Sequence, residues 1–228
     1  MKSIIISGGA NGLGLELSKQ LSEIGYQINI IDWDAKELDN VKNLLKDKCN
    51  IFLGDVSDEK FVSDTISKIN EHGEIYALIN NAGEPSFKLP IDYIKEDINK
   101  CFKGLEGMIL LSSNVLKIKK EKDLKIINII SSAGLRGNKQ ESVYCATKWG
   151  ERGYTESLKV AYKGTTVKIV GVYPGGIDTD FYKNSREYVS LEKQKTFMNP
   201  VDTAKIIINN AFNDINLTVS DIVIERNV

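Results

Sequence analysis

The chain is poor in residues that mark several common classes of protein. Its 228 residues include three cysteines and one histidine. Cys49, Cys101 and Cys145 are scattered without paired spacing, which favours free thiols in a reducing compartment over a disulfide framework. His72 stands alone near a predicted helix end, and no cluster of metal ligands is visible in the sequence. We therefore expect neither disulfides nor a bound metal ion.

Net charge and long apolar runs are lacking as well. Lys and Arg number 30 against 31 Asp and Glu, so the formal net charge is −1. That balance gives no general attraction to nucleic acid or to anionic lipid. No apolar run approaches the ~20 residues of a membrane-spanning helix, and the first residues lack the pattern of a signal peptide. We expect a cytoplasmic protein that binds neither nucleic acid nor a membrane.

Short apolar runs alternate with helical patterns along nearly the whole chain. Such alternation predicts an α/β fold in which a doubly wound parallel sheet carries helices on both faces. Hydrophobic residues make up 42% of the chain, and no repeat or linker divides it, so residues 1–228 are expected to form a single domain. About seven strands are predicted, over Ile4–Ile6, Gln27–Ile31, Asn50–Leu53, Ile75–Ile79, Leu124–Ile130, Val167–Val172 and Ile222–Ile224.

Helical spacing of apolar residues predicts the elements between these strands. The predicted helices cover Leu13–Ile24, Lys36–Lys46, Asp58–Glu71, Ile91–Ile118, Tyr144–Tyr162 and Pro200–Phe212. The polar, irregular stretch 180–199 is long for a connection, so we expect it to contain some helix and to act as a lid.

A glycine-rich loop follows the first strand. The stretch Ser3–Gly14 reads S-I-I-I-S-G-G-A-N-G-L-G, and helical spacing begins directly after it. Glycines let the backbone turn sharply and approach a diphosphate, whose charge then faces free N–H groups at a helix N-terminus. A simple tight turn is the alternative, because a lone glycine motif is common.

An acidic residue, Asp32, ends the second strand about 20 residues beyond the glycines, where a carboxylate can accept hydrogen bonds from an adenosine ribose. It would also repel a 2′-phosphate. Neither the segment Gly8–Gly14 nor Trp33 supplies a Lys or Arg that would bind one. We therefore expect NAD(H) rather than NADP(H). Asp32 could instead cap the next helix, although Asp34 is better placed for that role.

Tyr144 and Lys148 are four residues apart on a predicted helix and therefore share a face. A tyrosine phenol has an ordinary pKa of ~10, and a nearby ammonium lowers it. Tyr144 could then exchange a proton near neutral pH, as general acid–base catalysis requires. Ser131, at the end of the preceding strand, could hydrogen-bond the reacting oxygen.

The motifs taken in order resemble those of the short-chain dehydrogenases/reductases over essentially the full chain. The matching segments are Ser7–Gly14 (S-G-G-A-N-G-L-G), Asp55 after the third strand, Asn80–Gly83 (N-N-A-G), the serine loop at Ser131, Tyr144–Lys148 (Y-C-A-T-K) and Tyr173–Thr179 (Y-P-G-G-I-D-T). Each motif is modest alone, and their common order is highly specific. The resemblance implies a Rossmann-type fold and a homodimer or homotetramer associating through helices outside the cofactor cleft.

The resemblance also implies residue roles. Tyr144 would donate or accept the proton of the substrate oxygen, Lys148 would bind the nicotinamide ribose and lower the tyrosine pKa, and Ser131 would hold the carbonyl or hydroxyl. Ser131 is preferred over Ser132 because the family places its serine thirteen residues before the tyrosine. The expected cofactor-binding residues are Gly8, Asn11, Gly12, Leu13, Gly14, Asp32, Asp55, Val56, Asn81, Ala82, Gly83, Tyr144, Lys148, Pro174, Gly175, Ile177 and Thr179.

One departure from the family pattern bears on activity. The family usually has an asparagine in the helix after N-N-A-G, where it helps to hold a proton-relay water. Alignment on Gly107 puts Gly104 at that position, and alignment on Phe102 puts Leu105 there. The main hypothesis is an NAD(H)-dependent oxidoreductase that interconverts an alcohol and a ketone or aldehyde. The alternative is a non-catalytic nucleotide-sensing or scaffold protein on the same fold.

Overall fold

The computed structural model describes residues 2–120, 123–183, 188–213 and 217–227. Seven parallel strands form one sheet in the order β3-β2-β1-β4-β5-β6-β7. The strands are β1 (Lys2–Ser7), β2 (Gln27–Asp32), β3 (Cys49–Leu53), β4 (Glu74–Asn80), β5 (Leu124–Ile129), β6 (Val167–Pro174) and β7 (Asp221–Ile224). The sheet confirms the predicted doubly wound α/β fold.

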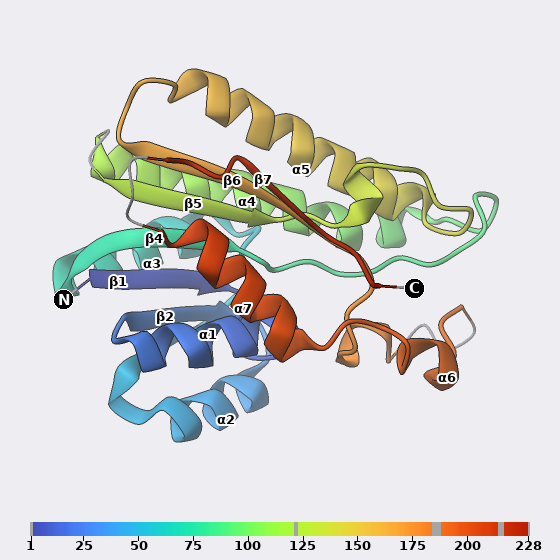
Figure 1. Cartoon of the computed structure of the whole chain (residues 1–228), viewed down its shortest axis with the longest axis horizontal. Helices are drawn as coiled ribbons and strands as arrows, with labels where there is room; N and C mark the ends of the chain where they lie inside the picture. Colours follow the sequence, from blue (N-terminus) through green and yellow to red (C-terminus); the bar gives the residue numbers. More distant parts are fainter. Residues whose placement is uncertain (1, 121–122, 184–187, 214–216, 228) are drawn as a thin grey trace.

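Helices cover both faces of this sheet (Figure 1). The helices are α1 (Gly12–Ile24), α2 (Ala35–Leu45), α3 (Glu59–His72), α4 (Lys95–Lys119), α5 (Ser142–Ala161), α6 (Leu191–Gln194) and α7 (Pro200–Ala211). Helices α1, α2 and α7 pack on one face, while α3, α4 and α5 pack on the other. None of the helices in the described part of the chain is long and apolar enough to cross a membrane.

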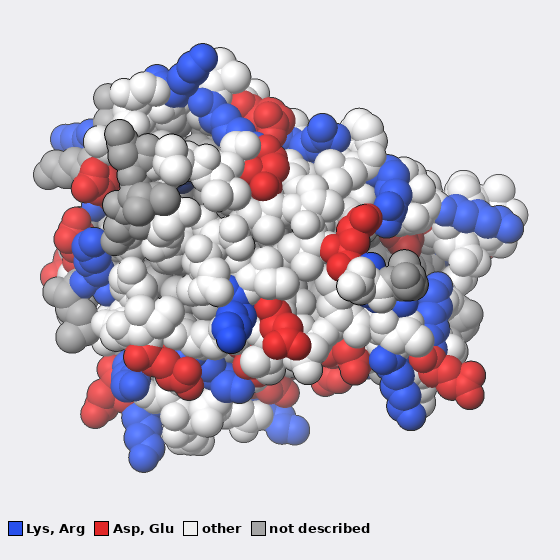
Figure 2. Space-filling view, viewed as in Figure 1, with Lys and Arg blue, Asp and Glu red and all other residues white. Residues whose placement is uncertain are grey.

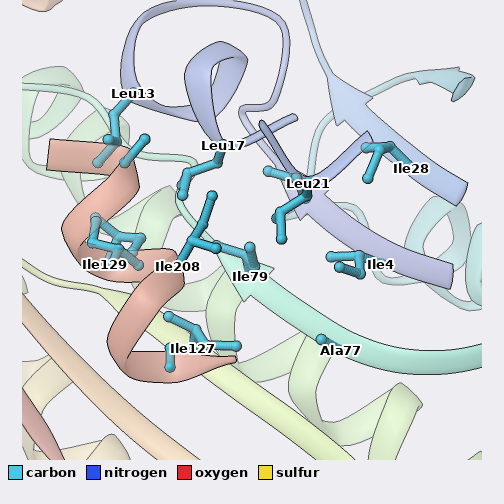
Figure 3. Packing of buried hydrophobic residues seen from close by; sticks show 14 of the residues in the cluster. Ile4, Leu13, Leu17, Leu21, Ile28, Ala77, Ile79, Ile127, Ile129 and Ile208 are labelled. Atoms are coloured by element: carbon cyan, nitrogen blue, oxygen red, sulfur yellow. The ribbon is translucent and has the colours of Figure 1, made fainter. Parts of the chain in front are cut away.

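Strand residues alternate between two apolar cores, one on each face of the sheet. Ile4 and Ile6 of β1 face α1, α2 and α7, whereas Ile5 faces α3, α4 and α5. All three are fully buried, because a parallel sheet covered on both faces exposes neither side of its central strands. Figure 3 shows the first core, where Leu17 of α1 lies near Ile208 of α7.

The start of the fourth helix differs from the prediction. The sequence pattern placed it at Ile91, but α4 begins at Lys95. Ile94 has an extended backbone, and its N–H donates to the Asp97 carboxylate, which also accepts from Lys88. This hydrogen bond satisfies a free N–H at the helix start, so the helix begins after Ile94.

The strand order reverses between β1 and β4, because β2 and β3 lie on one side of β1 and the later strands lie on the other. In sheets of this kind, ligands bind beyond the carboxyl ends of the strands at such a reversal. Both signs of charge are interspersed on the face of the molecule that Figure 2 shows. The strand order therefore places the expected ligand site at the carboxyl edge of the sheet, and the mixed charges in this view mark no strongly charged binding surface.

Candidate active site

A cavity of about 290 Å³ opens at the carboxyl edge of the sheet. The loops that follow the first six strands all contribute to its lining, and so does α4. It is lined by every residue predicted to touch a cofactor or substrate except Gly14. Those lining residues are Gly8, Asn11, Gly12, Leu13, Asp32, Asp55, Val56, Asn81, Ala82, Gly83, Ser131, Tyr144, Lys148, Pro174, Gly175, Ile177 and Thr179.

The glycine loop between β1 and α1 leaves the backbone exposed to this cavity. Gly8 and Gly12 have φ values of 63° and 54°, a left-handed conformation that L side chains rarely adopt. The Asn11 side chain accepts a hydrogen bond from Gly12 N–H at 2.6 Å and caps α1. The N-terminus of α1 therefore meets the cavity without a covering side chain on Gly12, an arrangement that fits a bound diphosphate.

Gly14 lies beneath the loop rather than in the cavity lining. A Cβ there would overlap the carbonyl oxygen of Gly8 and would lie 2.7 Å from Asn81 Nδ2. Asn81 Nδ2 itself donates to the carbonyl oxygens of Ser7 and Gly8 at 3.2 and 2.9 Å. Gly14 is thus required for α1 to pack against the loop, and Asn81 joins that loop to the end of β4.

Asp32 is almost fully buried at the end of β2. Its carboxylate accepts hydrogen bonds from the backbone N–H groups of Ala10, Trp33 and Asp34 at 3.2, 2.8 and 3.2 Å. Burial raises the pKa of Asp32, while these three donors oppose the rise. Asp34, not Asp32, caps α2 by accepting from Lys36 and Glu37. The carboxylate of Asp32 is therefore fixed against the glycine loop.

Asp55 faces the same end of the cavity but has a partner that the sequence did not suggest. Its Oδ2 accepts from Lys103 Nζ of α4 at 2.6 Å, and its Oδ1 accepts from Ser57 N and Oγ at 2.9 and 2.7 Å. Burial acts to raise the pKa of Asp55, but the hydrogen bonds from Lys103 and Ser57 outweigh it, so that pKa lies below its ordinary value. Lys103 bridges α4 to the loop after β3.

Tyr144, Ser131 and Lys148 come together at the opposite end of the cavity. Ser131 adjoins Tyr144 and acts to lower its pKa, and Lys148 Nζ lies 5.4 Å from the centre of the Tyr144 ring. Ser131 has φ 147°, an unusual conformation for a residue with a side chain, and its Oγ also accepts from Ala133 N–H at 3.1 Å. Strained residues of this kind concentrate where surrounding structure fixes a side chain for function.

The expected lowering of the tyrosine pKa by Lys148 is wrong for this structure. Burial raises the pKa of Tyr144 far above its ordinary value, and the negative charge of Glu151 raises it further. Lys148 Nζ contacts both carboxylate oxygens of Glu151, at 2.9 and 2.8 Å, so its positive charge is compensated. Tyr144 is consequently a protonated phenol at neutral pH.

The structure also decides between the two alignments of α4. Gly104 lines the cavity, and a Cβ there would lie 3.3 Å from Ala82 O and 3.5 Å from Glu151 Oε1. Leu105 instead packs toward Gly150 of α5. Of the two residues that the alignments offer for the asparagine position, Gly104 is therefore the one that faces the cavity.

Aromatic side chains from several segments surround Tyr144. Phe87 and Phe181 have ring centres 6.5 and 6.2 Å from that of Tyr144, and Tyr182 lies 5.8 Å from Phe87. Phe181 and Tyr182 belong to the predicted lid, which is joined to the end of β6 by a bridge between Ile177 and Met198. Residues 184–187 of that stretch lie outside the described residues, and the lid function stays a prediction.

Sequence reasoning missed three charged or aromatic contributors to the site. Glu151 follows Lys148 by three residues on one helix, so helical spacing could have indicated the pair. Lys103 and Phe87 gave no such signal, because their contacts come from distant parts of the chain. In the described part of the chain, no group of three or more potential ligands is placed to hold a metal ion.

Comparison with known proteins agrees with this geometry. The family model for short chain dehydrogenase matches residues 2–190. A 3-oxoacyl-[acyl-carrier-protein] reductase from Rickettsia prowazekii is 32% identical over 183 residues, covering 78% of this chain and 74% of that protein. The 15-hydroxyprostaglandin dehydrogenase [NAD(+)] from Bos taurus is 28% identical over 213 residues, covering 88% and 77%.

Solved structures show the same similarity. A short-chain dehydrogenase/reductase from Vibrio parahaemolyticus superposes with a TM-score of 0.86 at 28% identity, covering 98% of this chain and all of that one. ElxO with NADP bound has a TM-score of 0.86 at 26% identity, covering 98% of this chain and 96% of that one.

The chain belongs to the short-chain dehydrogenase/reductase family. It is an oxidoreductase that acts on alcohol and carbonyl groups with a nicotinamide dinucleotide of the NAD(P) class.

The packing of Gly14 gives the first testable prediction. Gly14→Ala should abolish measurable NADH binding, because the added Cβ displaces the Gly8 carbonyl and with it the loop. Gly153→Ala is the matched control, since Gly153 is exposed in α5 and has open space around it. That variant should bind NADH normally and be more stable by roughly 0.5–1 kcal/mol. NADH titration and urea unfolding measure both effects, and equal NADH affinity in the two variants would contradict the packing argument.

Proposed function

We propose that this protein interconverts an alcohol and a ketone or aldehyde with NAD(H), using Tyr144 as the acid–base group. The observation that carries the proposal is the grouping of Tyr144 and Ser131 beside Lys148, in a cavity that the glycine loop also lines. A proton donor, an oxygen-binding hydroxyl and a cation adjoin one enclosed space, as carbonyl reduction requires.

The proton steps follow from the side chains. In the reductive direction the substrate oxygen accepts hydrogen bonds from Ser131 and Tyr144. The nicotinamide, when bound, supplies a hydride to the carbonyl carbon. The Tyr144 O–H bond breaks as its proton moves to the oxygen, and the resulting phenolate takes a proton from water before the next turnover. Lys148 would hold the nicotinamide ribose, and the glycine loop with the N-terminus of α1 at Leu13 would hold the diphosphate.

Because the pKa of Tyr144 is raised, this residue enters the reaction as a phenol. A phenol that stays protonated at neutral pH can donate its proton to a carbonyl oxygen, whereas alcohol oxidation requires the phenolate as a base. Rates of oxidation should therefore rise with pH through the alkaline range. Phe87, Phe181 and Tyr182 exclude water from the phenol and favour a substrate with an apolar group next to its carbonyl.

Tyr144→Phe tests the catalytic proposal. The variant removes only the hydroxyl, so turnover should fall by at least about 100-fold while NADH affinity stays within a factor of about three. The measurements are NADH absorbance during a screen of alkyl and aryl aldehydes and ketones, and NADH titration by the fluorescence of Trp33, which lines the cavity. Full activity of the variant on any substrate that the wild type turns over would contradict the proposal.

The same screen separates the enzyme from the alternative of a nucleotide-sensing or scaffold protein, which the glycine at position 104 motivates. Turnover of any compound in the screen eliminates that alternative. NADH binding without turnover of any of them would favour it.

The preference for NAD(H) rests on Asp32 and on two lysines at the same end of the cavity. Asp32 is a buried carboxylate that would repel a 2′-phosphate. Lys103 is paired with Asp55 and Lys100 with Glu96, so both cations near this end already have carboxylate partners. One similar protein is named as an NAD(+) dehydrogenase and another was solved with NADP bound, so the proposed preference rests on Asp32 and the two lysines of this chain.

Asp32→Asn tests this preference. The wild type should bind NADH at least about tenfold more tightly than NADPH, a difference of ~1.4 kcal/mol, and the variant should reduce that ratio because the repelling charge is gone. Asp34→Asn is the control, since Asp34 caps α2 and asparagine caps equally well. Equal affinities of the wild type for NADH and NADPH would refute the proposed preference.

We further propose a homodimer or homotetramer. Helices α4 and α5 pack side by side and carry exposed large apolar side chains at Ile98, Phe102, Ile109, Trp149 and Val160. Exposed apolar groups gathered on two adjacent helices favour association with a second copy. Sedimentation velocity should give a dimer or tetramer for the wild type and a larger monomer fraction for Phe102→Glu/Trp149→Glu. A wild type that stays monomeric at micromolar concentration would contradict this.

A further inference from the structure

A buried carboxylate that the proposed chemistry does not use lies beside Lys148. Glu151 is 1% exposed and Lys148 is 5% exposed, so their ion pair is almost fully removed from water. Burial raises the pKa of the Glu151 carboxyl, and the Lys148 ammonium opposes that rise through two short contacts, at 2.9 and 2.8 Å. Burying two charges costs several kcal/mol per ion, and apolar residues often replace such a pair without loss of stability. Stability alone therefore does not account for Glu151.

Helix α4 leaves the space that the Glu151 carboxylate fills. A Cβ at position 104 would lie 3.5 Å from Glu151 Oε1, and the remaining atoms of an asparagine would extend beyond it. On its other side Lys148 approaches Gly83, since a Cβ there would lie 3.4 Å from Lys148 Nζ. The Glu151 carboxylate and an asparagine side chain at position 104 would therefore occupy the same space next to Lys148. A glutamate from α5 occupies it in this chain.

The charges around Tyr144 explain what this substitution does. The titratable groups that act on Tyr144 or Glu151 are Lys148 of α5, Glu141 directly before α5, Cys101 of α4 and Tyr182 after β6. Glu84, in the loop after β4, acts on Cys101. Lys148 supplies the only positive charge in this set, and Glu151 compensates it directly. Glu151 therefore removes the attraction that would otherwise favour a phenolate at Tyr144.

We propose that Glu151 is a positioning residue that fills the space left by Gly104 of α4, holds the Lys148 ammonium beside the cavity and compensates its charge next to Tyr144. This inference deepens the proposed function and rests on the roles given there to Tyr144 and Lys148. By compensating Lys148, Glu151 reduces the stabilisation of a phenolate at Tyr144, so the phenolate that alcohol oxidation requires forms only at higher pH.

Glu151→Gln tests the electrostatic part without needing a substrate. The change keeps the shape and removes the charge, so the unpaired ammonium of Lys148 should favour a phenolate at Tyr144. Ultraviolet absorbance counts ionised tyrosines as pH rises. Up to about pH 11, Glu151→Gln should show one more phenolate than Glu151→Gln/Tyr144→Phe, whereas wild type and Tyr144→Phe should coincide. If Glu151→Gln and its Tyr144→Phe derivative also coincide, the proposal is wrong.

Glu156→Gln is the matched control for that experiment. Glu156 pairs with Lys159 at 2.7 Å on the same helix with the same three-residue spacing, but it is exposed and distant from Tyr144 in the chain. Glu156 also acts on Tyr173, whose pKa is raised mainly by burial, so the comparison is again made with a Tyr144→Phe derivative. Glu156→Gln and Glu156→Gln/Tyr144→Phe should coincide up to about pH 11, as wild type and Tyr144→Phe do. Glu151→Asp, which keeps the charge, should also leave the Tyr144 titration unchanged, whereas an effect of packing alone would make it resemble Glu151→Gln.

A second pair of variants tests the placement even if Glu151→Gln does not fold. Gly104→Asn should lower the melting temperature by about 3 °C or more, because the new side chain meets the Glu151 carboxylate. In a Glu151→Ala background, Gly104→Asn should lower the melting temperature by less than half as much. If Gly104→Asn and Glu151→Ala lower the melting temperature additively, the proposal that Glu151 fills the space beside position 104 is wrong. Full activity of Tyr144→Phe would instead overturn the proposed function, so the two failures are distinguishable.

Discussion

The close contact between the loop after β1 and the end of β4 is the constraint on which the site depends. Ser7 Oγ accepts from the N–H groups of Asn81 and Ala82 at 3.0 and 3.1 Å, while the Asn81 side chain donates back to the loop. Gly14 has no room for a Cβ under the Gly8 carbonyl. These contacts fix the point where the strand order reverses, and so hold the helix N-terminus of α1 and the segment Asn81–Gly83 around one cavity.

Most of the fold could be predicted from the sequence because its signals are local. The run Ile4–Ile6 reads as a strand buried on both faces, and Leu13, Leu17 and Leu21 give the helical spacing of α1. Polar and glycine residues follow each strand, and parallel strands bring their carboxyl ends to one edge. The cavity lining therefore matches the residues that these strand ends suggested, apart from Gly14, which packs one layer below.

The parts that could not be predicted depend on contacts between distant segments. The start of α4 is fixed by Asp97, and Lys103 reaches Asp55 across 48 residues of sequence. The protonation of Tyr144 was predicted wrongly because the Tyr144–Lys148 spacing indicates a nearby cation but not its burial or its counter-ion. Glu151 supplies that counter-ion from the same helix, and Gly104 supplies the room for it.

A structure of the protein crystallised with NADH tests the central claim most directly, because that claim is the placement of one dinucleotide between the glycine loop and the Tyr144–Lys148 pair. The account predicts the diphosphate at the glycine loop and the N-terminus of α1, next to the Leu13 N–H, and the nicotinamide ribose within hydrogen-bond reach of Lys148 Nζ. NADH bound elsewhere, or bound with Lys148 and Tyr144 facing away from the nicotinamide, would contradict it.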